Sequence, residues 1–207
     1  MNFVALDFET ANYRRDSVCE MGIAVVENGQ ITETRSWRIR PKHNWFHHGN
    51  IRVHGITAAD VAEEPEFDSI WQEAKPYFEH ANIVAHNASF DLSCLRHVLT
   101  QYELAHPTLY YACSLQVARR AWYGFTSYGL GPLSQRFQIQ LNHHAAESDA
   151  IACAHILLKA CQDHNIINFS EIGNTFGLRM GKLYAGGYIS AGSLKSSSKT
   201  IRSSHSA

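Results

Sequence analysis

The alternation of apolar and polar positions divides the beginning of the chain into strands. Residues 2–8 are predicted to form a first strand, and residues 20–27 and 31–40 are predicted to form a second and a third. Asn28-Gly29 lies between the last two strands, and this dipeptide is typical of a tight hairpin because both of its residues readily adopt positive φ. The chain is therefore expected to begin with an antiparallel meander.

Helical spacing of apolar residues follows a polar stretch at about 41–64, which is expected to be irregular. Apolar positions between 67 and 78 predict an amphipathic helix, and Pro76 is expected to bend its last turn. Strands then alternate with helices, which predicts an α/β fold with a mixed sheet of about five strands flanked by helices. The remaining elements are predicted as a strand at 82–85, a helix carrying Leu92, Leu95, Val98 and Leu99, a strand at 109–112, helices at 114–122 and 130–137, and a long helix from about 147 to 161.

The composition changes beyond about residue 165. From Ile172 onward the sequence contains Arg179, Lys182 and three further cations but no Asp or Glu, and Gly and Ser are frequent. We therefore predict one main domain at 1–165 and a basic, Gly/Ser-rich extension at 166–207. The last dozen residues of the extension are expected to be disordered.

The overall composition is that of a globular protein, with 45% hydrophobic and 18% charged residues among 207. The net charge is -1, so any nucleic acid must be bound by a local site and not by the field of the whole molecule. No stretch approaches the roughly 20 apolar residues of a membrane helix, and the N-terminus lacks the basic region of a signal peptide. The five cysteines form no Cys-x-x-Cys pair. We therefore expect a cytoplasmic protein with reduced thiols and no membrane partner.

Asp7 and Glu9 stand two residues apart in the first predicted strand. Because side chains alternate across a sheet, both carboxylates are expected to project from the same face. Two acids on one face are costly to bury unless a cation neutralises them, and Mg²⁺ or Mn²⁺ prefers such oxygen ligands. Taken alone, the pair would fit solvated acids at the end of a strand equally well.

Two further acids lie near the starts of predicted helices. Asp91 ends the run His-Asn-Ala-Ser-Phe-Asp after the fourth strand, where the helix dipole tolerates a negative charge for structural reasons alone. Asp149 lies near the start of the long helix among small and apolar residues, so it is expected to face into the fold, where an unpaired carboxylate is costly. His144 precedes Asp149 by five residues and is placed to lean over the same site.

In combination these motifs resemble the DnaQ-like (DEDDh) 3′–5′ exonucleases, a branch of the ribonuclease H-like fold. Asp-x-Glu in the first strand, His-Asn-Ala-Ser-Phe-Asp after the fourth and His-x4-Asp at the last helix occur in this order. The similarity covers about residues 1–160 and includes the segments 53–57, 113–120 and 127–130. It is greatest to small members such as exonuclease X and to the proofreading subunit of bacterial DNA polymerase III.

The resemblance implies a two-metal phosphodiester hydrolase. Asp7, Glu9, Asp91 and Asp149 would hold two Mg²⁺ or Mn²⁺ ions, some of them through water. His144 would take the proton from the attacking water. The products would be 5′-mononucleotides released stepwise from a free 3′ end.

The resemblance also implies a set of substrate contacts. The backbone at Phe8 and Thr10 would cup the terminal nucleotide, and the loop of His54 and Ile56 would abut its base. Phe8 and Phe90 are candidates for stacking on a base or sugar, although a Phe beside a sheet belongs to the core more often than to a platform.

Asn87 and Ser89 have two interpretations, since they could contact the scissile phosphate or cap the following helix. For the whole chain, the leading interpretation is a 3′–5′ exonuclease acting on single-stranded or frayed DNA 3′ ends in repair or proofreading, with a polymerase or repair protein as partner. An exoribonuclease that trims RNA ends is the alternative, because contacts to a 2′-OH depend on loop geometry. A non-catalytic binding module of the same fold is a third interpretation, disfavoured by the presence of all four acids and the histidine.

Overall fold

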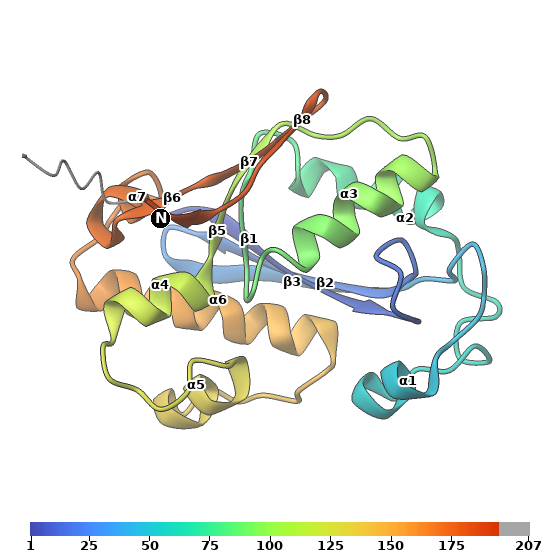
Figure 1. The fold of residues 1–207 in the computed structure, drawn as a ribbon, viewed down its shortest axis with the longest axis horizontal. Coiled ribbons are helices and arrows are strands. Elements are labelled where there is room, and N and C mark those ends of the chain that lie inside the picture. Colours follow the sequence, from blue (N-terminus) through green and yellow to red (C-terminus); the bar gives the residue numbers. More distant parts are fainter. Residues whose placement is uncertain (195–207) are drawn as a thin grey trace, which may run out of the picture.

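The computed structural model describes residues 1–194, and it begins with the predicted antiparallel meander (Figure 1). β1 (Phe3–Thr10) pairs with β2 (Val18–Glu27), and β2 pairs with β3 (Gln30–Arg38). Asn28 and Gly29 form the turn between β2 and β3 with φ of 52° and 80°, which confirms the hairpin. The predicted disorder of the last dozen residues falls outside the described residues.

Parallel pairing builds the centre of the sheet. β4 (Asn82–Ala85) pairs with β1, and β5 (Leu109–Cys113) pairs with β4, both in parallel. The order β3-β2-β1-β4-β5 confirms the predicted mixed sheet.

Two strands of the C-terminal segment extend this sheet beyond the five that the sequence predicts. β7 (Gly181–Tyr184) and β8 (Gly187–Ile189) bring it to seven strands, and β6 (Leu178–Arg179) and β9 (Gly192–Ser193) form a separate pair. β7 can lie beside β5 because Gly181 packs directly on the Tyr111 ring, where a Cβ atom would overlap it.

The helices agree with the predicted positions except for two that were not predicted, α7 (Glu171–Phe176) in the C-terminal extension and α1 (His48–His54) in the stretch expected to be irregular. α1 buries none of its side chains, so no apolar period marks it in the sequence. The 3₁₀ turn η1 (Lys75–Tyr77), which contains Pro76, follows α2 as predicted. The other helices are α2 (Phe67–Ala74), α3 (Asp91–Gln101), α4 (Ser114–Ala121), α5 (Leu130–Phe137) and α6 (Ala146–Asp163).

Helices cover both faces of the sheet. Figure 1 shows α2 and α3 on one side and α4, α5 and α6 on the other. Alternate residues of β1 serve the two sides, since Leu6 and Phe8 belong to the core with α2 and α3, while Phe3 and Ala5 belong to the core with α6. Ile172 of the predicted extension joins this second core, and the division at residue 165 remains a prediction. Within residues 1–194 no helix has the length and apolar character needed to span a bilayer.

Candidate active site

β1 and α6 bring three carboxylates together at one end of the sheet. The side-chain period of two that places Phe3 and Ala5 on the α6 side also places Asp7 and Glu9 there. The first turn of α6 carries Asp149 to the same place, and oxygen atoms of the three carboxylates lie within 4.8 Å of one another. The structure therefore assembles three of the four predicted acids around one point.

A glycine in β2 permits this close approach. Gly22 pairs with Asp7 in the β1–β2 ladder, and a Cβ atom at position 22 would overlap the backbone of Ala146 and Glu147. The first turn of α6 therefore rests directly on β2. Its Ala146 N–H donates a hydrogen bond to Glu20 Oε2 at 3.2 Å.

Asp91, the fourth predicted acid, reaches the site from the start of α3. Its side chain is buried, and its Oδ1 accepts a hydrogen bond from the Phe8 N–H at 3.1 Å. Phe8 lies between Asp7 and Glu9 in β1, so this bond joins the start of α3 to the strand that carries the other acids. All four acids are thus held by backbone that is itself part of the core.

Burial raises the pKa of all four carboxyl groups, and repulsion by the other acids adds to it at Asp7, Glu9 and Asp91. Burial, with the charges of Asp91 and Asp149 next, holds the pKa of Asp7 well above its usual value. Burial, with the charge of Asp149 next, raises the pKa of Glu9 to about 8. Burial raises the pKa of Asp91 to about 7 against the opposing bond from Phe8, and burial also raises the pKa of Asp149. An all-oxygen site under this repulsion fits a hard divalent cation, which would favour the ionised form of every ligand.

These shifts predict that the metal-free protein loses stability as the pH rises. The pKa of Glu9 is about 8 in the folded protein against an ordinary value of 4.5, so between these pH values the folded state binds more protons than the unfolded state. The free energy of unfolding therefore falls as pH increases through this window. Each pKa unit of difference between the folded and unfolded states changes the free energy of unfolding by about 1.4 kcal/mol. For a protein of this size, each such unit lowers the Tm by about 3–5 °C.

Thermal melts at pH 5 and pH 8, in EDTA and in Mg²⁺, measure this effect. We expect the EDTA sample to melt lower at pH 8, and Mg²⁺ to raise the Tm more at pH 8 than at pH 5. A metal-free protein that becomes more stable toward pH 8 would contradict the assignment of these carboxyl groups.

Two neighbouring histidines stand beside the acids. His144, which has a φ of 68°, places Nδ1 3.8 Å from Glu9 Oε1. Partial burial and the charge of His143 lower the pKa of His144, so the ring is neutral and able to accept a proton near pH 7. The His143 ring stacks on it at 3.9 Å and places its own Nδ1 3.0 Å from Asp149 Oδ2. The sequence analysis did not assign His143 to the site.

The predicted nucleotide loop contacts the end of β1. His54 Nε2 lies 3.2 Å from the Thr10 carbonyl oxygen, and Asn50 donates a hydrogen bond to the same oxygen at 2.8 Å. The Ile56 side chain is only 2% exposed and packs in a small core that includes Phe46. Ile56 therefore supports the loop with its side chain, which does not extend into the site.

Phe8 and Phe90 differ in exposure. The Phe8 side chain is 2% exposed and lies in the main core, so it has no free face for stacking, and the expectation of stacking by this side chain is corrected. Its backbone N–H is the part that contributes to the site, through Asp91. Phe90 is partly exposed, and the Arg15 guanidinium lies 4.3 Å from its ring centre.

Asn87 and Ser89 lie exposed in the turn between β4 and α3. Asn87 has a φ of 69°, and its Oδ1 accepts a hydrogen bond from the Ser89 hydroxyl at 3.2 Å. No side chain caps the start of α3. Within residues 1–194 neither Asn87 nor Ser89 makes a capping hydrogen bond to α3, and both side chains are exposed, so their contact with the scissile phosphate stays a prediction.

Three residues that no sequence motif marked lie in β2 or in the loops beyond β1. Glu20 pairs with Glu9 across β1 and β2, is buried, and lies 3.3 Å from Arg38 Nε. The position of Glu20 beside Glu9 follows from the register between β1 and β2, which the sequence does not specify. Tyr13 and Trp45 are 78% and 50% exposed, and their rings meet edge to face at 5.9 Å. Unlike Phe8, these two rings expose aromatic surface on which a base or sugar could stack.

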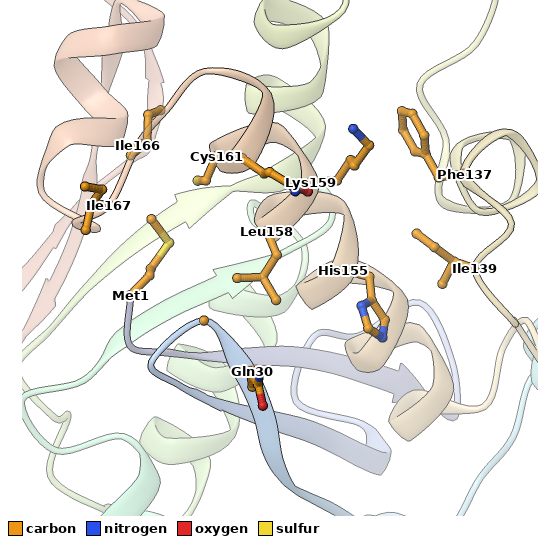
Figure 2. A pocket seen from close by; sticks show the side chains of 12 residues that line it. Met1, Gln30, Phe137, Ile139, His155, Leu158, Lys159, Cys161, Ile166 and Ile167 are labelled. Carbon is orange, nitrogen blue, oxygen red and sulfur yellow. The ribbon is translucent and has the colours of Figure 1, made fainter.

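A hollow in the surface lies away from these acids. About 700 Å³ in volume, it is lined by Met1, Gln30, Leu158 and Ile167 among others (Figure 2). Met1 precedes the start of β1, whereas the acids lie toward its end. The hollow contains none of the four carboxylates and is not part of the candidate site.

Known structures share this fold. Exonuclease X in complex with 5′-overhanging duplex DNA superimposes with a TM-score of 0.66 at 22% identity, over 84% of this chain and 99% of that chain. A 3′-exonuclease described in 3′-end-specific recognition of a histone mRNA stem-loop superimposes with a TM-score of 0.69 at 16% identity, over 95% of this chain and 71% of that chain. These similarities confirm the predicted ribonuclease H-like mixed sheet.

Sequence relatives agree with the structural ones. The 3′–5′ exonuclease DinG of Bacillus subtilis is 30% identical over 161 residues, and a PolC-type DNA polymerase III of Streptococcus mutans is 27% identical over 177 residues. The aligned regions cover 76% and 82% of this chain but only 17% and 12% of those relatives. Residues 4–157 match the RNase_T exonuclease family model, and the chain therefore belongs to this family of DEDDh-like 3′–5′ exonucleases.

Proposed function

We propose that this protein is a metal-dependent 3′–5′ exonuclease that releases 5′-mononucleotides from DNA, with a preference for single-stranded or frayed 3′ ends. The observation that carries the proposal is the group formed by Asp7, Glu9 and Asp149, whose oxygen atoms lie within 4.8 Å of one another. A structural role would leave these buried acids repelling one another without compensation. Bound divalent cations would compensate this repulsion.

Asp7, Glu9, Asp91 and Asp149 are the residues that would hold two Mg²⁺ or Mn²⁺ ions. When bound, such ions activate water for attack at phosphorus and stabilise the leaving 3′ oxygen. The Phe8 N–H keeps Asp91 oriented, and the rigid first turn of α6 keeps Asp149 in place. The protein thus supplies a preformed set of oxygen ligands, so that little reorganisation is needed during the reaction.

His144 is the proposed general base. Its Nδ1 lies toward Glu9, which leaves Nε2 as the atom that would accept the proton of the attacking water. A group that accepts a proton works best when its pKa lies near or below the working pH, and partial burial lowers the pKa of His144. His143 is proposed to orient Asp149, a metal ligand, because its Nδ1 is close to the Asp149 carboxylate.

The terminal nucleotide would be held by the backbone at Phe8 and Thr10 and by the loop of His54 and Ile56. Asn87 and Ser89 would contact the scissile phosphate with their exposed polar atoms. Phe90 would offer a face to a base or sugar. Stacking on an aromatic ring contributes about 1–3 kcal/mol per base and tolerates any sequence.

DNA is the proposed substrate because the sequence relatives named above are a 3′–5′ exonuclease and a DNA polymerase. By the same comparison, proofreading or repair beside a polymerase is the proposed role. RNA is the second candidate, since a structural neighbour is named for recognition of a histone mRNA stem-loop. A reducing cytoplasmic location is supported by five cysteines that are all free and buried.

Digestion of matched single-stranded DNA, duplex DNA and RNA, each labelled at the 5′ end, tests this proposal. We expect Mg²⁺ or Mn²⁺ to support stepwise shortening from the 3′ end, fastest on single-stranded DNA, and EDTA to abolish it. Faster shortening of RNA would establish the exoribonuclease alternative. If no substrate released mononucleotides with either metal ion, the non-catalytic interpretation would replace the proposal.

A further inference from the structure

A second hollow lies between the loop that follows β1 and the outer side of α3, the helix that begins with Asp91. Its volume is about 370 Å³. The residues that line it include Arg14 from the loop, Arg96, His97 and Thr100 from α3, and His106 beyond α3. We refer to this surface as the α3 groove.

The α3 groove carries more positive than negative charge. Asp16 is the single acid among its lining residues, and it already accepts two hydrogen bonds from the Arg14 guanidinium at 2.7 and 2.9 Å. Arg96 forms no ion pair with a carboxylate anywhere in residues 1–194, and burial together with the charge of Arg96 lowers the pKa of His106. Arg14 is thus paired with Asp16, whereas Arg96 has no acidic partner within residues 1–194, and an anionic ligand would compensate the charge of Arg96.

Arg96 is held in place by an aromatic ring of the C-terminal segment. Its guanidinium lies 3.8 Å from the ring centre of Tyr188 in β8. Such stacking orders the planar guanidinium while leaving its N–H donors free for a phosphate. Tyr188 lies outside residues 4–157, which match the exonuclease family, so this support comes from the chain's own extension.

Residues next to the groove reach the candidate active site. Arg15, next to Arg14, lies 4.3 Å from the Phe90 ring, and its charge acts on the carboxyl group of Asp91. From Asp91 to Thr100 the axis of α3 rises about 14 Å. A stacked strand advances about 3.4 Å per nucleotide, so this length corresponds to about four nucleotides.

We propose that the α3 groove binds the phosphodiester backbone of the substrate strand, about three to four nucleotides before the terminal nucleotide. Arg96 and Arg14 would contact phosphates, and His97 and Thr100 would supply further hydrogen bonds. The groove would raise affinity for strands long enough to reach it and would take no part in bond cleavage. This inference rests on the proposed function, because it assumes that the terminal nucleotide lies at the carboxylates.

The test compares a dinucleotide with a single-stranded DNA dodecamer, because only the dodecamer can reach past the groove. Arg96→Ala is expected to raise KM for the dodecamer about three- to tenfold with kcat retained, and to lower the dodecamer-to-dinucleotide ratio of kcat/KM by the same factor. The dependence of log(kcat/KM) on log salt should become shallower by about 0.7 for each phosphate that the variant no longer neutralises. Arg14→Ala, at an exposed side chain, provides a second test that does not disturb the contact with Tyr188.

The chain offers a matched control for each variant. Arg136 stacks on Phe125 at 3.8 Å, the same distance as Arg96 on Tyr188, but on α5. Arg35 bonds to Glu33 at 2.6 Å in β3, as Arg14 does to Asp16. Arg136→Ala and Arg35→Ala remove the same charge elsewhere and are expected to keep the wild-type ratio. If Arg96→Ala and Arg14→Ala lowered kcat/KM equally for the dodecamer and the dinucleotide, or lowered it for neither, the proposed role of the groove would be wrong.

Binding of a labelled dodecamer in EDTA, followed by fluorescence anisotropy, separates this inference from the proposed function. Cleavage is not needed for this measurement, so Kd reports the groove even if the protein hydrolyses nothing. A wild-type protein that binds the dodecamer in EDTA but does not cleave it in Mg²⁺ or Mn²⁺ would reject the proposed function alone. A Kd that stays at the wild-type value in both Arg96→Ala and Arg14→Ala would reject the groove alone.

Discussion

Replacing Asp7 by Asn is expected to abolish exonuclease activity while making the metal-free protein more stable. Asp7 lies at the centre of the carboxylate group, where burial and the neighbouring acids raise its pKa. The neutral amide has the same shape but lacks the charge that would bind a cation, so we expect kcat to fall by about 10³-fold or more. The same change removes a buried like charge, so the Tm in EDTA at pH 8 should rise by about 3 °C or more.

A variant that is merely misfolded would lose both activity and stability, whereas Asp7→Asn is expected to lose activity and gain stability. Asp60→Asn is the control, because Asp60 is an exposed carboxylate that accepts hydrogen bonds from Thr57 at 2.6 and 2.7 Å. This control should keep full activity and should not raise the Tm. The metal assignment would be wrong if Asp7→Asn kept a substantial part of wild-type turnover, or if it melted below the wild type in EDTA.

Replacing His144 by Ala should lower kcat by about 10²–10⁴-fold, the usual contribution of a general base. Metal affinity should stay near the wild-type value, because the four oxygen ligands are untouched. The acidic limb of the pH–rate profile should also flatten. Since partial burial lowers the pKa of His144, we expect this limb below the ordinary histidine value of about 6.5. Single-turnover kinetics at saturating metal, over a range of pH, measure both effects.

His143 is a comparison of a different kind, because its Nδ1 lies 3.0 Å from Asp149 Oδ2. Its replacement by Ala should change how much metal ion is required for half-maximal activity, with a smaller effect on kcat once metal is saturating. His155, an exposed residue farther along α6, serves as the neutral histidine control. The general base would have to be reassigned if His143→Ala were the more damaging change at saturating metal, or if His144→Ala weakened metal binding in a titration.

Local patterns in the sequence predicted most of the elements because the burial of each is periodic. The helix α5 (Leu130–Phe137) and the strand β4 (Asn82–Ala85) have the predicted bounds. α1 was missed because it has no buried face, and its ends are set instead by the His47 side chain and by Gly55 at a φ of 78°. β7 and β8 were missed because they are short, and their pairing depends on a distant strand.

The candidate site was predicted only in part. Asp7 and Glu9 could be placed on one face because alternation is a local rule, and Asp91 and Asp149 because the order of motifs resembles a family. The burial of Phe8 and Ile56 could not be read in the same way, since it depends on which helix covers which face. Phe8 lies on the α3 side of β1, opposite to the acids on either side of it.

The sequence by itself determined the order of most strands and helices up to about residue 161, the identity of four acids and a histidine, and the family to which they point. These features depend on spacing along the chain, which is visible without a structure. The tertiary structure alone decided that Gly22 admits the first turn of α6, that His143 lies against Asp149, and that Tyr188 supports Arg96 beside α3. Each of these contacts joins residues that are distant in sequence or depends on an exact backbone turn, and such contacts form only when the whole sheet has assembled.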